Sequence, residues 1–222
     1  MIRVPEKELM CSNEQAASYA NANFSESNNI FINNTFQHVK IDNYTQLLDV
    51  GCGDGEIPIR ISKETDCEIT AIDGSQAMLN EFKKKIKKNN IRNIFLHKKL
   101  IDHNLFLGKS FDVIICNSVL HHVSDLSLFW NTIFRLSRKN GTICLMDLER
   151  PKSNKAMDDI LLKYGGKDPI LLDDFKNSLK AAYTINEVSQ QLDGYNNISF
   201  NIKPISDRHF FVNIVMTDDT VY

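Results

Sequence analysis

Short apolar runs alternate with amphipathic stretches through the middle of the chain. Five such runs predict strands, at residues 46–50, 68–72, 93–97, 111–116 and 142–146. Between them, Ser75 can cap a helix that runs to Lys88, and residues 125–137 repeat apolar side chains at helical spacing. The dipeptide Asn140-Gly141 predicts a turn before the fifth strand. Strands that alternate with helices in this way predict an α/β fold with a doubly wound, parallel sheet.

The alternation stops after residue 150. Residues 153–164 and 171–182 predict two helices, which we expect to form a helical cap above the sheet. Two further strands are predicted at 198–203 and 209–216, and the few residues between them permit only antiparallel pairing. The sequence therefore predicts a mostly parallel, seven-stranded sheet whose last strand is antiparallel.

The charge balance and the cysteines narrow the class of protein. Lys and Arg number 26 against 28 Asp and Glu, a formal net charge of −2, so we expect no nucleic-acid partner. The run Lys83–Lys88 lies along an amphipathic helix and predicts a solvated face. No apolar run approaches the roughly 20 residues of a membrane span, and residues 1–10 lack a signal-peptide pattern, so we expect no membrane partner. The cysteines form no C-x-x-C pair and indicate thiols in a reducing, cytoplasmic compartment: Cys11, Cys52, Cys67, Cys116 and Cys144.

A glycine-rich turn follows the first predicted strand. Glycines at 51, 53 and 55 let the backbone pass close under a ligand, and Pro58 falls in the first turn of the helix that comes next. Asp73 ends the second strand, where a carboxylate can accept hydrogen bonds from the two hydroxyls of a ribose. The combination predicts a site for a ligand that contains a ribose.

The glycine spacing distinguishes between nucleotide cofactors. A dinucleotide site requires G-x-G-x-x-G, so that a pyrophosphate can lie on the helix N-terminus. Here the spacing is G-x-G-x-G, and Asp49 and Asp54 flank it. Carboxylates at this point repel a pyrophosphate but suit a ligand with an ammonium and a sulfonium group. The pattern therefore disfavours the alternative of an NAD-type oxidoreductase.

Three segments together resemble the class I S-adenosylmethionine-dependent methyltransferases. Residues 47–55 resemble the first motif of that family, 73–79 its next motif, and 111–123 its fourth strand with the L-H-H turn. The likeness covers residues 45–150 well. It implies a Rossmann-like fold, S-adenosylmethionine as cofactor with S-adenosylhomocysteine as product, and methyl transfer to a small-molecule acceptor by in-line displacement.

The resemblance also assigns cofactor contacts. It implies that Gly51 and Gly53 line the methionine part, that Asp49 orients its amino group, and that Asp73 holds the ribose. Many relatives carry an acidic residue after the third strand for the adenine, whereas this sequence has Leu100 there. The full implied set is Asp49, Gly51, Cys52, Gly53, Asp73, Gly74, Met78, Leu100, Ile101 and Asn117.

Two adjacent histidines leave the carboxyl end of the fourth strand, the edge where open α/β sheets bind ligands. Histidine titrates near neutral pH and can act as a general base, which makes His121 the candidate catalytic residue. By resemblance to some small-molecule members, Tyr19 is its candidate partner. His122 and Asp147 are candidate substrate contacts. A purely structural role under the cap stays open for these rings, and too few oxygen ligands converge to predict a metal.

The length of 222 residues, with 42% hydrophobic, suits one compact domain, and the acceptor is unassigned. Its parts are an N-terminal helical lid (1–44), a cofactor-binding core (45–150), a helical cap insertion (151–183) and the last helix with a strand pair (184–222). We expect a monomer or a homodimer. The alternatives are an RNA or protein methyltransferase, whose Asn/Asp-Pro-Pro-Tyr/Phe signature is absent here, and a cofactor-binding module without catalysis.

Overall fold

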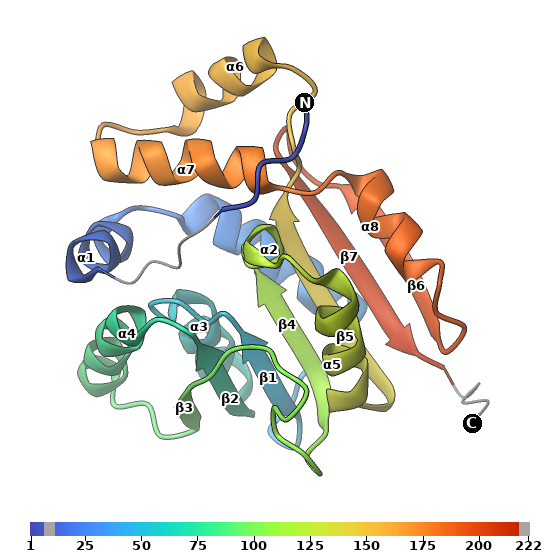
Figure 1. Ribbon diagram of the computed structural model, residues 1–222. Helices are drawn as coiled ribbons and strands as arrows, with labels where there is room; N and C mark the ends of the chain where they lie inside the picture. Colours follow the sequence, from blue (N-terminus) through green and yellow to red (C-terminus); the bar gives the residue numbers. More distant parts are fainter. Residues whose placement is uncertain (7–11, 218–222) are drawn as a thin grey trace.

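A seven-stranded sheet forms the centre of the computed structural model, which describes residues 1–6 and 12–217 (Figure 1). Leu47 and Leu48 are both fully buried but belong to two different apolar clusters, as alternation along a strand with two covered faces requires. The cluster around Leu47 contains side chains from the helices at residues 25–38, 56–65 and 76–89. The cluster around Leu48, on the other face of the sheet, contains side chains from the helices at 126–136 and 185–192. The fold therefore has three layers, with the sheet in the middle.

The elements follow one another along the chain with these bounds. They are α1 Asn13–Asn21, α2 Ser25–His38, β1 Gln46–Val50, α3 Glu56–Thr65, β2 Glu68–Asp73, α4 Gln76–Asn89, β3 Ile94–Lys98, β4 Phe111–Asn117, η1 Leu120–His122, α5 Leu126–Leu136, β5 Ser137–Leu148, α6 Asn154–Tyr164, α7 Pro169–Ala181, α8 Ile185–Leu192, β6 Ile198–Pro204 and β7 His209–Met216.

The strand order is β3-β2-β1-β4-β5-β7-β6, and β7 alone runs antiparallel to its neighbours. This arrangement confirms the predicted sheet, including its antiparallel last strand. The direction of strand order reverses between β1 and β4, and this is the switch point where such sheets open a crevice for a ligand.

The turn predicted at Asn140-Gly141 lies inside a strand and not before one. These residues lie inside β5, which begins at Ser137, and the pairing with β4 shifts register between Phe111 and Val113. Asn140 adopts a left-handed φ of 61°, so the residues that suggested a turn form a bulge within a longer strand.

The N-terminal region divides into three segments. Phe31 and Ile32 of α2 are buried against the sheet, so this helix belongs to the covering layer. Helix α1 packs against α4 and α7 at the carboxyl edge of the parallel strands. Residues 1–6 form an extended strap that passes beside α7 (Figure 1), and its Arg3 side chain reaches the backbone of η1 at His121.

Arg3 fixes that strap in place. Its guanidinium donates hydrogen bonds to the backbone oxygens of His121, Val123 and Ala181, and it lies 3.9 Å from the centre of the Tyr183 ring. A positive charge on an aromatic face and three charge-assisted hydrogen bonds make a strong local anchor. The strap, the cap helix α7 and the turn after β4 are thus held together.

Four cysteines are buried and free, at positions 52, 67, 116 and 144, whereas Cys11 and the chain end at 218–222 lie outside the described residues. Within the part of the chain that the structure describes, no helix has the length and apolar character needed to cross a bilayer.

Candidate functional site

The glycine-rich turn bends sharply at the carboxyl end of β1. Gly51 has a φ of 71°, a conformation that side chains disfavour, and its amide and that of Cys52 both donate to the carbonyl of Ile72. A Cβ atom at Gly51 would lie 2.1 Å from a methyl group of Val119. The turn therefore requires glycine for backbone conformation and for space, and it lies directly against the segment that follows β4.

Replacing Gly51 with alanine is expected to lower the free energy of unfolding by about 2 kcal/mol or more, because a left-handed strain is added to a clash. The matched control is Gly108→Ala, where φ is 77° but no atom lies within 4 Å of the new Cβ. That change adds strain without a clash, so urea unfolding should show a smaller loss. Equal losses in the two variants would contradict the role of the Val119 contact.

Asp73 connects the glycine-rich turn to the turn between β2 and α4. One of its oxygens accepts a hydrogen bond from the amide of Gly53 at 2.9 Å, and the other accepts from the amide of Ser75 at 2.7 Å. Burial raises the pKa of this carboxyl, and the two backbone donors lower it in part. Each oxygen keeps a second lone pair, so the side chain is held rigidly and can still accept from a ligand.

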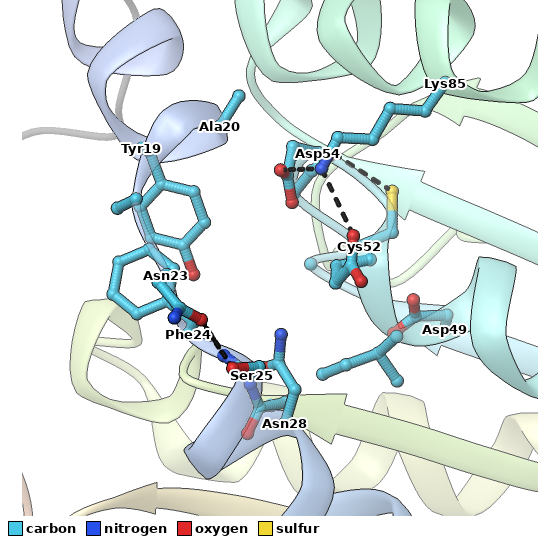
Figure 2. Close-up of a pocket in the computed structure, with 16 residues that line it drawn as sticks. Tyr19, Ala20, Asn23, Phe24, Ser25, Asn28, Asp49, Cys52, Asp54 and Lys85 are labelled. Atoms are coloured by element: carbon cyan, nitrogen blue, oxygen red, sulfur yellow. Dashed lines mark hydrogen bonds and ion pairs between the residues drawn. The ribbon is translucent and has the colours of Figure 1, made fainter. Parts of the chain in front are cut away.

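A pocket of about 280 Å³ opens beside this turn. Figure 2 shows Tyr19, Asn23, Phe24 and Asn28 on one side and Asp49, Cys52 and Asp54 on the other. Gly51, Gly53 and Asn117 also line the pocket. The N-terminal helices thus face the glycine-rich turn across a cavity at the switch point of the sheet, whereas no described residue of 151–183 lines it.

Asp49 and Asn117 each leave an acceptor oxygen unused in the pocket wall. Asp49 Oδ2 and Asn117 Oδ1 are buried and have no hydrogen-bond partner among the described residues. Burial, and then the charge of Asp73, raise the pKa of Asp49 to about 8. Buried acceptors without partners are unfavourable, so the pair indicates a ligand that supplies hydrogen-bond donors.

The second flanking carboxylate has a different environment. Asp54 forms an ion pair with Lys85 at 2.5 Å, although the sequence placed that lysine on a solvated face. The side chain of Lys85 is 26% exposed, and its amino group reaches the edge of the pocket. Of the two predicted carboxylates, Asp49 alone is left to receive a cationic ligand.

Tyr19 lies in the pocket wall, with its ring centre 4.5 Å from that of Phe24. Burial, and then the charges of Asp54 and Asp73, raise the pKa of its hydroxyl. Within the described residues this hydroxyl forms no hydrogen bond, and the sequence-based partner His121 has other contacts.

His121 is held by Asp147 in the turn after β4. Its Nδ1 lies 2.6 Å from Asp147 Oδ1, and its amide donates to Oδ2 of the same carboxylate at 3.3 Å. Burial lowers the pKa of His121, but the charge and hydrogen bond of Asp147 more than reverse this and raise it. Asp147, predicted as a substrate contact, is 1% exposed and is occupied in orienting this ring.

Glu6 completes this cluster and was not predicted from the sequence. Its Oε2 lies 3.2 Å from His122 Nδ1 and 3.9 Å from His121 Nε2. Burial raises the pKa of Glu6, whereas burial and the neighbouring His121 lower the pKa of His122 to about 3. A lone glutamate in a polar N-terminal stretch carries no sequence signal, because only the path of the strap brings it to the histidines.

The remaining predicted cofactor residues lie around the same edge. Met78 is buried with its methyl group 3.3 Å from where a Cβ of Gly53 would be, and Gly74 lies in the turn between β2 and α4. Leu100 is 56% exposed, and Ile101 packs against the larger apolar cluster. Of the residues chosen for the adenine side, Met78 is therefore enclosed whereas Leu100 is not.

Comparisons with known proteins agree with this geometry. The model of a methyltransferase domain family matches residues 41–169. A ubiquinone biosynthesis O-methyltransferase of Rickettsia akari is 29% identical over 119 residues, which cover 54% of this chain and 46% of that protein. The chain thus spans about half the length of the curated relatives it matches.

Solved structures share the fold over nearly the whole chain. A SAM-dependent methyltransferase from Aquifex aeolicus has a TM-score of 0.70 at 17% identity, covering 93% of this chain and 99% of that one. A plantazolicin methyltransferase, solved with a triazolic desmethylPZN analog and SAH, has a TM-score of 0.71 at 15% identity and covers 92% of this chain and 91% of its own.

Proposed function

The chain belongs to the class I S-adenosylmethionine-dependent methyltransferases, and from this premise we propose that its methyl acceptor is a small molecule. The names of two relatives, one in ubiquinone biosynthesis and one for plantazolicin, support such an acceptor. The near-neutral charge offers no attraction for a nucleic acid. The four buried free thiols support a cytoplasmic location.

The observation that carries the cofactor assignment is the pair of unpaired acceptors at Asp49 and Asn117. An amino group has the donors that both oxygens lack, and Gly51 and Gly53 line the same pocket. Asp73 would hold the ribose through its free lone pairs. When bound, S-adenosylmethionine supplies an electrophilic methyl group on a sulfonium.

The protein's own contribution is mainly orientation. In-line displacement requires the acceptor atom, the methyl carbon and the sulfur to be collinear, and holding reactants in this way supplies much of a rate enhancement. We propose that the strap and the turn after β4 define the acceptor side, because both lie at the carboxyl edge next to Asn117. His121 would act there through Nε2, since Nδ1 is occupied by Asp147.

Acceptor-dependent formation of S-adenosylhomocysteine tests this function, with a panel of phenols, amines and thiols. Asp73→Ala should weaken S-adenosylmethionine binding about tenfold or more, because two hydrogen bonds at about 1 kcal/mol each are lost. The turn itself loosens as well, since Asp73 also accepts from Gly53 and Ser75. Calorimetry measures the affinity; an unchanged dissociation constant in a folded variant would contradict the ribose contact.

A further inference from the structure

We propose that Glu6, His121 and His122 bind a divalent transition-metal ion at the carboxyl edge of β4. Three ligand atoms, one carboxylate oxygen and two ring nitrogens, lie within 4.8 Å of one another. The role of such an ion in holding an acceptor rests on the proposed function, whereas the binding itself does not. With the ion bound, Nε2 of His121 is a ligand and not a proton acceptor, so His121 acts as a base only in the metal-free protein. No sequence motif predicts this site, because the carboxylate comes from the distant N-terminal strap.

The spacing of the three atoms suits a tetrahedral ion. Glu6 Oε2 lies 3.2 Å from His122 Nδ1 and 3.9 Å from His121 Nε2. Bonds of about 2.0–2.1 Å to a tetrahedral ion place neighbouring ligand atoms about 3.3 Å apart. The separation between Glu6 and His122 already matches that value. All three ligand atoms lie within 4.8 Å of one another, so small side-chain rotations bring the other two separations to it.

Surrounding groups orient the ligands as in known metal centres. Metal-binding histidines commonly present their second ring nitrogen to a carboxylate, and Asp147 occupies that position on His121 at 2.6 Å. Ser178 donates to the Glu6 carboxylate at 3.3 Å. Arg3 fastens the strap to the backbone of His121, so the third ligand arrives on an anchored segment. These contacts hold Glu6 and His121 in place before any ion binds, and His122 meets the pair through Glu6.

The donor set indicates which ion would bind. Two imidazoles and one carboxylate suit Zn²⁺, Co²⁺ or Fe²⁺, whereas Mg²⁺ and Ca²⁺ prefer sites made of oxygen. Three protein ligands leave one position open, the arrangement of catalytic rather than structural sites. The side chains of Glu6 and His122 keep 12% and 19% of their surface exposed, which gives that position access. The open position can therefore take an atom of the acceptor as the fourth ligand.

The test uses the full chain without a histidine tag, stripped with a chelator and titrated with Co²⁺ and then Zn²⁺. We expect one equivalent of Co²⁺ to give the visible absorption of a tetrahedral complex, which Zn²⁺ displaces. Glu6→Gln and His122→Ala should each weaken binding at least 100-fold, and Asp147→Asn by about 10–100-fold. The control is His103→Ala, which removes an exposed imidazole elsewhere and should leave binding unchanged.

Two results would overturn the metal site: wild type that binds neither ion, or binding that survives the loss of His122. Calorimetric S-adenosylmethionine binding, measured on each variant, reports that the protein is folded. If the cofactor binds and the metals do not, this inference fails and the proposed function stands. If the metal binds but no acceptor is methylated, the proposed function fails and the metal site stands.

Discussion

Replacing Asp49 with asparagine is expected to weaken S-adenosylmethionine binding by about 10²-fold and to stabilise the ligand-free protein. The variant loses a charge-assisted interaction with the amino group, a contribution of about 1.5–3 kcal/mol. In the empty pocket, however, the same carboxyl is buried with Oδ2 unpaired. The residue thus favours binding at the expense of stability, and its replacement should change the two quantities in opposite directions.

The pH dependence follows from the pKa of Asp49, which burial and Asp73 raise to about 8. The folded protein holds this proton between roughly pH 4 and 8 while the unfolded chain does not, so the group makes the fold less stable as pH rises through that window. Asp49→Asn lacks this loss, and its advantage in melting temperature should be larger at pH 9 than at pH 5. At pH 7 wild type should also release about one proton as the cofactor binds, because the ammonium favours the ionised carboxylate.

Calorimetry in buffers of different ionisation enthalpy measures that proton, and thermal unfolding measures stability. The matched control is Asp54→Asn, which changes a carboxylate in the same turn that already pairs with Lys85. Asp54→Asn should lower the free energy of unfolding slightly, because the ion pair with Lys85 is lost. Cofactor binding to this variant should still release the proton of Asp49. If both variants lose the same affinity for S-adenosylmethionine, the two carboxylates are equivalent, and the proposal that Asp49 in particular binds the amino group is wrong.

The sheet could be predicted because its determinants are local. Continuous apolar runs such as residues 111–116 and caps such as Ser75 specify their own elements, and the short link before β7 forces antiparallel pairing. Asn140-Gly141 misled about where the strand begins: the dipeptide has the preference of a turn, but β5 begins before it at Ser137, and the pairing with β4 passes from Ser137 to Thr142.

The candidate site was predictable only where sequence neighbours form it. Asp49 and Gly51 lie in one motif, so their proximity follows from the chain itself. Asp54 is neutralised because Lys85 reaches it from another helix, whereas Asp49 has no such partner. Glu6 reaches His122 because Arg3 anchors the strap across the sheet edge. Contacts of this kind depend on the path of the backbone, which no local pattern encodes.

Replacing His121 with alanine is expected to lower turnover by about 10²-fold or more, while the dissociation constant for S-adenosylmethionine stays nearly unchanged. The ring does not line the pocket that contains Asp49 and Asn117, so cofactor contacts survive its removal. The acceptor side loses the one nitrogen, Nε2, that Asp147 leaves available. Steady-state kinetics with an acceptor found in the panel measures the first quantity, and calorimetry measures the second.

Two companion variants separate catalysis from packing. Asp147→Asn keeps the shape of the side chain but removes the charge that orients His121, so turnover should fall by a smaller factor than in His121→Ala. Tyr19→Phe removes only a hydroxyl in the pocket wall, and turnover should change little if His121 serves the acceptor. Added imidazole should partly restore His121→Ala, because a small ring can occupy the vacated space and present the same nitrogen. If His121→Ala turns over like wild type while Tyr19→Phe does not, the hydroxyl of Tyr19 is the group that acts on the acceptor, and His121 with Asp147 only fastens the strap to the sheet edge.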